Sequence, residues 1–209
     1  VRLGVLTGEP QAQLDGFKSR VLHSDMLKNR DPYPTQRVFK LYLSSPGSVN
    51  NIFILQQDVP SLPMLPDGQI ELAVHSTGLN FRDMLNILDL DPTRTSRPLG
   101  LECASVVRSA GHCVVHLGSS DSTYGMAMGC LASVVRVDAR AQVTMPRALS
   151  FEHACTLPIL WCTIRLALGE CVQLHASQRV LIHAATGGVG IVALELAHFV
   201  GAEASGSVS

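Results

Sequence analysis

The residues best suited to chemistry form a glycine-rich stretch, HAATGGVG, at 183–190. From Ala185 to Gly190 it matches the G-x-G-x-x-G spacing of dinucleotide-binding turns, with alanine in the first glycine position. An apolar run at 180–182 precedes it, and apolar residues at helical spacing follow as far as Val200. Between a strand and a helix, such glycines let backbone N–H groups approach a pyrophosphate. The stretch therefore predicts a dinucleotide site at Thr186, Gly187, Gly188, Val189 and Gly190, and the alternative is a glycine turn without a ligand.

The residues beyond this turn indicate which dinucleotide binds. An acidic residue about 20 positions on would hold the ribose 2′-hydroxyl of NAD. That place falls at Ser207 to Ser209, which offers hydroxyls and no carboxylate, and Glu203 comes too early in the second strand. An acid would repel a 2′-phosphate, whereas serine can donate a hydrogen bond to it. The sequence therefore favours NADPH, with Ser207 and Ser209 at the phosphate; the alternative is solvated hydroxyls.

Composition limits the possible partners. The 209 residues are 46% hydrophobic and 16% charged, and 16 Lys and Arg face 17 Asp and Glu. No basic stripe with interleaved aromatic residues suggests nucleic acid. No apolar run approaches the roughly 20 residues that cross a bilayer, and no signal core is visible at the N-terminus. We expect a cytoplasmic protein that binds neither nucleic acid nor membranes.

The six cysteines are scattered, without a C-x-x-C pair. A structural zinc site needs closely spaced Cys or His pairs, and a catalytic one needs three ligands with an open position. His112 beside Cys113 is the nearest approach to such a pattern. We expect buried free thiols and no metal.

Hydrophobic periodicity divides the chain. Residues 1–37, broken by Pro32 and Pro34, are expected to be a leader or linker. From Val38 onward, short β-type runs predict a small, closed, mostly antiparallel β unit interrupted by a helix at 81–88. The predicted strands are VFKLYL, NNIFIL, QIELAVHS, CASVVRS, CVVHLG (113–118) and ASVVRV.

The last third has a helical and then a strand–helix–strand pattern. Ser150 is expected to begin two helical segments that meet at Pro158. The strand at 180–182 leads through the glycine turn into a helix with Gly201 as its C-cap. A second strand is expected from Ala202.

Several stretches together resemble the enoyl reductase domain of modular polyketide synthases and animal-type fatty acid synthase, in the medium-chain dehydrogenase/reductase superfamily. They agree with it in order and spacing from about Val38 to Ser209. The stretches are GLNFRDMLNIL (78–88), PLGLECASVV (98–107), YGMAMGCLASVVRVDA (124–139), LSFEHACTLPILWCTIRLAL (149–168) and RVLIHAATGGVGIVALELAHFVGAE (179–203).

The resemblance implies an α+β fold. A GroES-like antiparallel β substrate domain would occupy 38–150, and 151–209 would hold a helical connection and the first strand–helix–strand of a zinc-free Rossmann domain. It also implies NADPH-dependent reduction of the α,β double bond of an enoyl thioester on an acyl carrier protein. The partners would be the other domains of a multidomain synthase, with a homodimer formed through the parent.

Two further residues gain roles from the resemblance. Asn80 matches an asparagine near the nicotinamide, and Thr163 matches a threonine that positions the cofactor. Asn80 could instead cap the helix that follows it, and Thr163 could bond to its own helical turn. Arg82 and Asp83 are expected to be a local structural pair.

The sequence also departs from the family pattern. Asp91 stands where many members have a tyrosine that influences protonation of the α-carbon. A buried carboxyl with a raised pKa could donate a proton, but we expect a solvated turn acid before Pro92. The family's lysine and aspartate would lie beyond Ser209, so the catalytic residues are not identified.

Three functions stay open at this point. The first is an incomplete and poorly active piece of an enoyl reductase, since most of the Rossmann sheet would also lie beyond Ser209. The second is a zinc-free quinone oxidoreductase-like reductase. The third is a non-catalytic structural remnant of a megasynthase.

Overall fold

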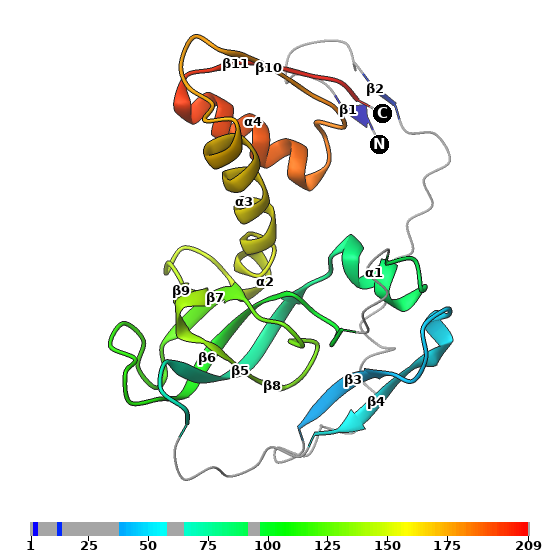
Figure 1. The fold of residues 1–209 in the computed structure, drawn as a ribbon, viewed down its shortest axis with the longest axis vertical. Helices are drawn as coiled ribbons and strands as arrows, with labels where there is room; N and C mark the ends of the chain where they lie inside the picture. The colour runs from blue at the N-terminus through cyan, green and yellow to red at the C-terminus, as the bar shows by residue number, and fades with distance from the viewer. Residues whose placement is uncertain (1, 4–11, 14–37, 58–64, 92–96, 209) are drawn as a thin grey trace. The chain divides into compact units, whose positions relative to one another are not determined.

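The computed structural model describes residues 2–3, 12–13, 38–57, 65–91 and 97–208 (Figure 1). The chain divides into two compact units, Val1–Arg37 and Val38–Ser209. In the first unit, β1 (Arg2–Leu3) pairs antiparallel with β2 (Ala12–Gln13). The rest of the predicted leader lies outside the described residues.

The second unit begins with β structure. In the described part of the chain, a five-stranded antiparallel sheet has the order β8-β5-β6-β7-β9. A hairpin precedes it, and its first strand forms a bridge between Lys40 and Ala132. The elements are β3 (Phe39–Leu43), η2 (Val49–Asn51), β4 (Ile52–Gln56), β5 (Gln69–Gly78), β6 (Glu102–Ala110), β7 (Ser122–Met126), β8 (Val134–Asp138), η3 (Ala139–Ala141) and β9 (Gln142–Thr144).

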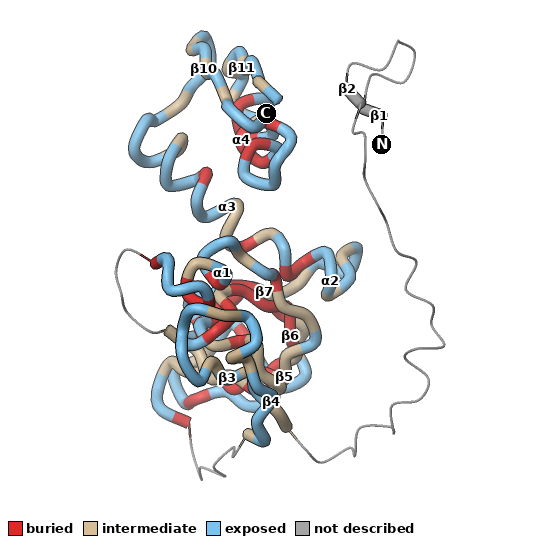
Figure 2. Tube along the Cα trace, turned by 90° about the vertical axis from the view of Figure 1, so that its right-hand side faces the viewer, coloured by how far each residue is buried: buried red, intermediate tan, exposed pale blue. Residues whose placement is uncertain are grey.

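Alternating apolar residues build the core of this sheet. Ile70 and Leu72 on β5 are fully buried. Glu71 between them is buried as well, because Arg108 and Arg136 form ion pairs with its carboxylate at 3.2 and 2.8 Å. Buried positions concentrate on β5, β6 and β7 and recur along α4 (Figure 2).

The predicted strands need three corrections. The predicted strand at 113–118 is irregular, because Val114 N–H turns back to the Gly111 carbonyl and the His116 ring bonds to the Ala139 carbonyl. β7 and β9 were not predicted, since both strands are short and their buried positions include the polar residues Thr123 and Gln142. The sheet is not closed as predicted, because its edge strands β8 and β9 are not paired with each other.

The helical predictions hold at their starts. α1 spans Phe81–Ile87. The Ser150 hydroxyl accepts from His153 N–H at 3.3 Å and caps α2 (Phe151–Ala154). Pro158 is the first residue of α3 (Pro158–Ile164), which continues as the π-helix η4 (Arg165–Cys171).

This helical stretch corrects the expectation about membrane spans. Phe151–Cys171, 21 residues with mean hydropathy 1.3, is long and apolar enough to cross a membrane by length and composition. Three of its apolar side chains, Leu160, Ile164 and Leu168, pack against the α4 cluster that contains Val192 and Leu196, but only 22% of the stretch is buried. A helix packed against another helix in this way passes the same length test.

The last elements form a parallel strand–helix–strand unit, as predicted. β10 (Arg179–Ile182) pairs in parallel with β11 (Glu203–Gly206). α4 (Gly188–Val200) connects them and ends at Gly201, whose φ of 76° is the left-handed cap conformation. The α+β fold, an antiparallel β part followed by the start of a Rossmann unit, is therefore confirmed.

Candidate functional site

The glycine turn places the start of α4 beside the end of β10. Gly187 is the N-cap residue, and its N–H donates to the Ala184 carbonyl at 3.0 Å. The first N–H groups of a helix have no partner within that helix, so those of Gly188, Val189 and Gly190 can bind an anion. Thr186, the other predicted contact, is exposed in the same turn.

Close packing explains two of the glycines. A Cβ on Gly190 would lie 2.6 Å from the Ala184 carbonyl oxygen and 2.6 Å from the Ala185 Cα, so a side chain here would force the helix away from the turn. A Cβ on Gly206 would lie 2.6 Å from the Ala185 side chain. Gly187 differs, since its nearest atom would be 3.4 Å away, an ordinary contact. The turn, called the glycine cradle below, is therefore closely packed at Gly190 and Gly206. Its exposed side at Gly187, called the rim, has space for a side chain.

Ser207 lies directly after β11, at the edge of this cradle. Its N–H donates to the Ile182 carbonyl and its carbonyl accepts from Ala185 N–H, both at 2.9 Å. Its hydroxyl also lies 2.9 Å from Nδ1 of His183. The structure therefore adds His183, which the sequence analysis did not select although it begins the glycine stretch. Ser209, the other predicted phosphate contact, lies outside the described residues.

A cavity of about 880 Å³ adjoins the glycine turn. One wall consists of β10, the turn and α4, and Phe81 of α1 contributes from the β part. Ile164, Ala167 and Leu168 line it from α3 and η4. The lining is mostly apolar, with the helix start and His183 as its polar groups, which suits a planar ring held by a charged tail.

Asn80 immediately precedes Phe81 and is half-buried. It forms the capping box of α1 with Asp83, and its N–H donates to Asp83 Oδ2 at 3.1 Å. Its side-chain Nδ2 donates to Glu102 Oε1 at 2.8 Å. Asn80 is therefore the N-cap residue of α1, as the alternative interpretation predicted. A cofactor role for Asn80 stays a prediction.

Thr163 makes the bond that its alternative interpretation predicted. Its Oγ1 donates to the Ile159 carbonyl at 2.7 Å, one turn earlier in α3. The residue is exposed and is not among the described residues that line the 880 Å³ cavity. Its role in positioning a cofactor stays a prediction.

The acidic and basic residues around α1 differ from the expectation. Arg82 and Asp83 do not pair with each other. Arg82 pairs with Asp91 at 3.3 Å, and Asp83 Oδ1 accepts from Gly100 N–H at 2.9 Å. Asp91 is buried rather than solvated, and it is ion-paired with the Arg82 guanidinium. An ion-paired carboxylate has no proton to donate, so this geometry does not support Asp91 as the acid.

The cysteines are half buried and half exposed. Cys103, Cys130 and Cys155 are buried, whereas Cys113, Cys162 and Cys171 are exposed, so the expectation of buried thiols is wrong for three of the six. Burial and the nearby Glu102 carboxylate raise the pKa of the Cys155 thiol.

One group of possible metal ligands occurs among the described residues. Side-chain atoms of Asp67, His112 and Cys113 lie within 4.8 Å of one another, and all three residues are exposed. The expectation that the chain binds no metal stays a prediction.

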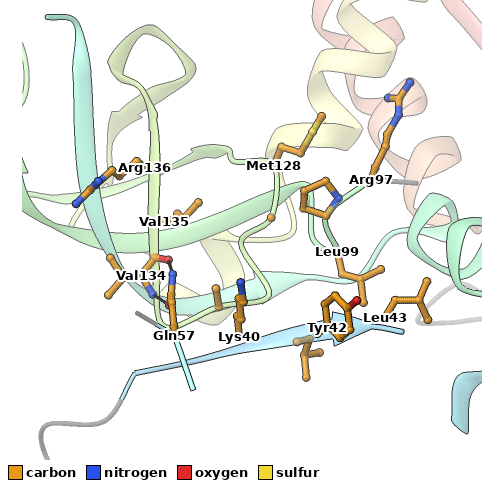
Figure 3. Close-up of a pocket in the computed structure, with 14 residues that line it drawn as sticks. Lys40, Tyr42, Leu43, Gln57, Arg97, Leu99, Met128, Val134, Val135 and Arg136 are labelled. Carbon is orange, nitrogen blue, oxygen red and sulfur yellow. Dashed lines mark hydrogen bonds between the residues drawn. The ribbon is translucent and has the colours of Figure 1, made fainter. Parts of the chain in front are cut away.

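Two other cavities contain none of the predicted cofactor contacts. One, of about 810 Å³, is lined by β7, η3 and α3, including Trp161. The other, of about 610 Å³, lies beside β3 (Figure 3). There the Gln57 amide donates to the Val134 carbonyl at 2.6 Å and accepts from its N–H at 3.3 Å. This bond fixes the hairpin to β8.

Comparison with known proteins identifies the fold. No family model matches the chain. The crystal structure of the CurK enoyl reductase is 30% identical, with a TM-score of 0.75, and the match covers 82% of this chain and 54% of that one. The Escherichia coli quinone oxidoreductase complexed with NADPH is 26% identical, with a TM-score of 0.66 and 81% and 52% coverage. The chain therefore belongs to the medium-chain dehydrogenase/reductase superfamily.

Sequence relatives narrow this class. The highly reducing polyketide synthase ZEA2 of Gibberella zeae is 37% identical over 78% of this chain. The pikromycin polyketide synthase component PikAII of Streptomyces venezuelae is 34% identical over 82% of it. The chain spans only 7% and 5% of these two proteins. It is a homologue of polyketide synthases with the fold of the enoyl reductases.

Proposed function

We propose that the chain is the NADPH-binding and substrate-binding part of an enoyl reductase in polyketide or fatty acid synthesis. Bound NADPH would supply the hydride that reduces the α,β double bond of an enoyl thioester on an acyl carrier protein. The observation that carries the proposal is the glycine cradle at Gly187–Gly190, where a tight turn and a helix N-terminus meet a largely apolar cavity.

Different residues of this chain would contact different parts of the cofactor. The first N–H groups of α4 would bind the pyrophosphate, with Thr186 at the rim. Ser207, and His183 beside it, would contact the 2′-phosphate, as would Ser209. Asn80 would contact the nicotinamide carboxamide, and Thr163 would position the same ring. Asp91 is not assigned the role of proton donor.

The same relatives support a proposal about the protein in which this chain works. We propose that the chain works within a multidomain synthase in the cytoplasm, that it dimerises through that parent, and that 38–150 and 151–209 are its substrate and cofactor domains. A free quinone oxidoreductase-like reductase is the second candidate, favoured by the fold of the Escherichia coli enzyme. Reduction of a quinone, without reduction of an enoyl thioester on acyl carrier protein, would support that second candidate.

The test is a titration of NADPH into the purified chain, followed by nicotinamide fluorescence and by thermal unfolding. Gly187→Asp places a carboxylate at the N-cap, where the open rim accepts it and where aspartate favours the helix. The same charge repels a pyrophosphate, so we expect at least about a tenfold loss of affinity with no loss of stability.

Gly187→Ala is the matched control, because it adds a side chain without the charge. It should bind NADPH within about twofold of the natural chain, since a Cβ there makes only ordinary contacts. Equal binding by Gly187→Asp and Gly187→Ala would contradict a pyrophosphate site at this turn. Binding of NADPH without any turnover would favour the structural remnant.

A further inference from the structure

Glu102 holds a buried carboxylate that the sequence analysis did not select. It begins β6 and is 3% exposed. Its Oε1 accepts from Nδ2 of Asn80 at 2.8 Å, and its Oε2 accepts from the backbone N–H of Ile159 at 2.8 Å. The two oxygens therefore bind different elements: the residue before α1, and the first turn of α3.

Gly78 packs closely against this carboxylate. A Cβ on Gly78 would lie 2.5 Å from Glu102 Oε1 and 2.6 Å from the Cys155 carbonyl oxygen. The Glu102 main chain is fixed as well, because Cys130 Sγ donates to its carbonyl at 3.1 Å. A side chain at position 78 would displace either the carboxylate or the end of α2.

The N-terminus of α3 needs this carboxylate. Pro158 at the first position has no N–H, so Ile159 presents the first helical donor. The N-cap residue Leu157 has no side-chain oxygen that could accept it. Glu102 supplies the acceptor from another part of the chain, and its negative charge is favourable beside a helix N-terminus.

The same carboxylate fixes the orientation of Asn80. An asparagine amide has ends of similar shape, and its neighbours decide which end is nitrogen. A carboxylate oxygen accepts the bond here, so the amide nitrogen of Asn80 faces Glu102. The nitrogen carries a second N–H, which suits the carboxamide oxygen of a nicotinamide. Phe81, the next residue, already lines the cavity beside the glycine turn.

We infer that Glu102 is a positioning residue for the nicotinamide half of the cofactor, because it holds the Asn80 amide in one orientation and ties it to the start of α3. This inference rests on the proposed function. The hydrogen bonds of the Glu102 carboxylate go to Asn80 and Ile159, and none goes to the glycine turn or to Ser207. A substitution of Glu102 should therefore weaken the binding of a ligand with a nicotinamide ring more than the binding of a ligand without one.

The experiment compares two ligands on the full chain: NADPH, and 2′-phospho-ADP-ribose, which keeps both phosphate groups and lacks the nicotinamide. Glu102→Gln is nearly isosteric but offers one oxygen to two N–H donors, so it leaves Asn80 or Ile159 facing an NH2 group. We expect the Kd of NADPH to rise about tenfold and that of the analogue to stay within about twofold. Thermal unfolding is recorded for each variant.

Two more variants separate positioning from general support. Glu71→Gln neutralises another buried carboxylate of the same sheet, which pairs with Arg108 and Arg136 and not with Asn80. It should leave the ratio of the two Kd values unchanged. In an Asn80→Ala background, Glu102→Gln should add no further change to that ratio, because both substitutions remove the same interaction.

Several results would overturn the inference. Equal losses for both ligands would make Glu102 a structural brace only, and so would additive effects with Asn80→Ala. If the natural chain binds the analogue as tightly as NADPH, the nicotinamide ring contributes nothing to binding. That result refutes the inference but leaves the proposed dinucleotide site intact. A natural chain that binds neither ligand refutes the proposed function itself. If Glu102→Gln does not unfold cooperatively, Glu102→Asp takes its place, because it keeps both oxygens on a shorter side chain. It must weaken the binding of NADPH more than the binding of the analogue.

Discussion

In the proposed site, Ser207 is the residue that would distinguish a ribose 2′-phosphate from a ribose 2′-hydroxyl beside the glycine turn. Its main-chain bonds to Ile182 and Ala185 hold it in place whatever its side chain is, so substitutions there test only the side chain. Ser207→Asp brings a carboxylate to the proposed 2′-phosphate position. We expect it to weaken NADPH by about tenfold while NADH, which lacks that phosphate, changes little. Titration of both dinucleotides measures the ratio.

Ser207→Ala is the control for this substitution. It removes the hydroxyl that contacts His183 without adding charge, and it should weaken NADPH by only a fewfold. An unchanged preference for NADPH over NADH in Ser207→Asp would place the 2′-phosphate elsewhere.

Residues that depend on local pattern were predictable, and those that depend on distant partners were not. The glycine turn and the Ser150 cap follow from spacing within a few residues. Asp91 was interpreted as a solvated turn acid, because its ion-pair partner Arg82 lies on a helix nine residues earlier. Glu102 lies just before the predicted strand CASVVRS and was not selected, since its partner Ile159 is 57 residues away. Sequence periodicity carries no information about such pairs.

At the scale of elements, α4 was predicted together with its ends. Gly201 has a φ of 76° and donates its N–H to the Ala197 and His198 carbonyls. The added Cβ of Gly201→Ala would meet only Ala176 Cβ at 3.4 Å, so the cost comes from the backbone and not from a clash. We expect the free energy of unfolding to fall by about 1 kcal/mol, the cost of a left-handed alanine. Urea unfolding followed by circular dichroism measures it.

Gly169→Ala is the opposite control for this helix end. Gly169 lies inside the π-helix, and its added Cβ would meet only the flexible Arg165 side chain at 3.1 Å. The unfolded chain loses freedom while the helix accepts alanine, so the variant should be neutral or more stable by up to about 1 kcal/mol. Destabilisation by Gly169→Ala equal to that by Gly201→Ala would contradict the left-handed cap as the cause.

The β part was less predictable than the helices for a physical reason. β5 carries the clear period-two alternation, β6 carries the adjacent β-branched residues Val106 and Val107, and the two strands pair with each other inside the sheet. β7 and β9 carry weak patterns, because Thr123 and Gln142 are buried polar residues whose side chains bond to each other at 3.1 Å. A period of two in hydrophobicity cannot reveal a strand whose buried positions are polar.

At the scale of the whole Val38–Ser209 unit, the sheet and α4 have their own cores, and a third, small cluster of Ala104, Ala154 and Cys155 joins β6 to α2. The sheet core gathers Ile70, Leu72 and Val107 with further residues from 103 to 139. The core around α4 is smaller, with buried Ile164, Val192, Ala193 and Leu196. Large apolar side chains on the second part are exposed, Phe199 by 84% and Leu181 by 61%. Less buried apolar surface means a lower free energy of local opening.

Amide hydrogen exchange should therefore separate the two parts. We expect faster exchange in β10, α4 and β11 than in β5 and β6, because opening the smaller core exposes less apolar surface. NADPH at 100 times its Kd would add about 2.7 kcal/mol of protection to the elements that form its site and little to β5 and β6. At the same NADPH concentration, a tenfold weaker site in Gly187→Asp should reduce that added protection to about 1.4 kcal/mol or less, while the exchange of the free chain stays unchanged. A uniform gain over both parts would instead mean that the unit opens as one body, with the Glu102 link between Asn80 and α3 strong enough to couple the two cores.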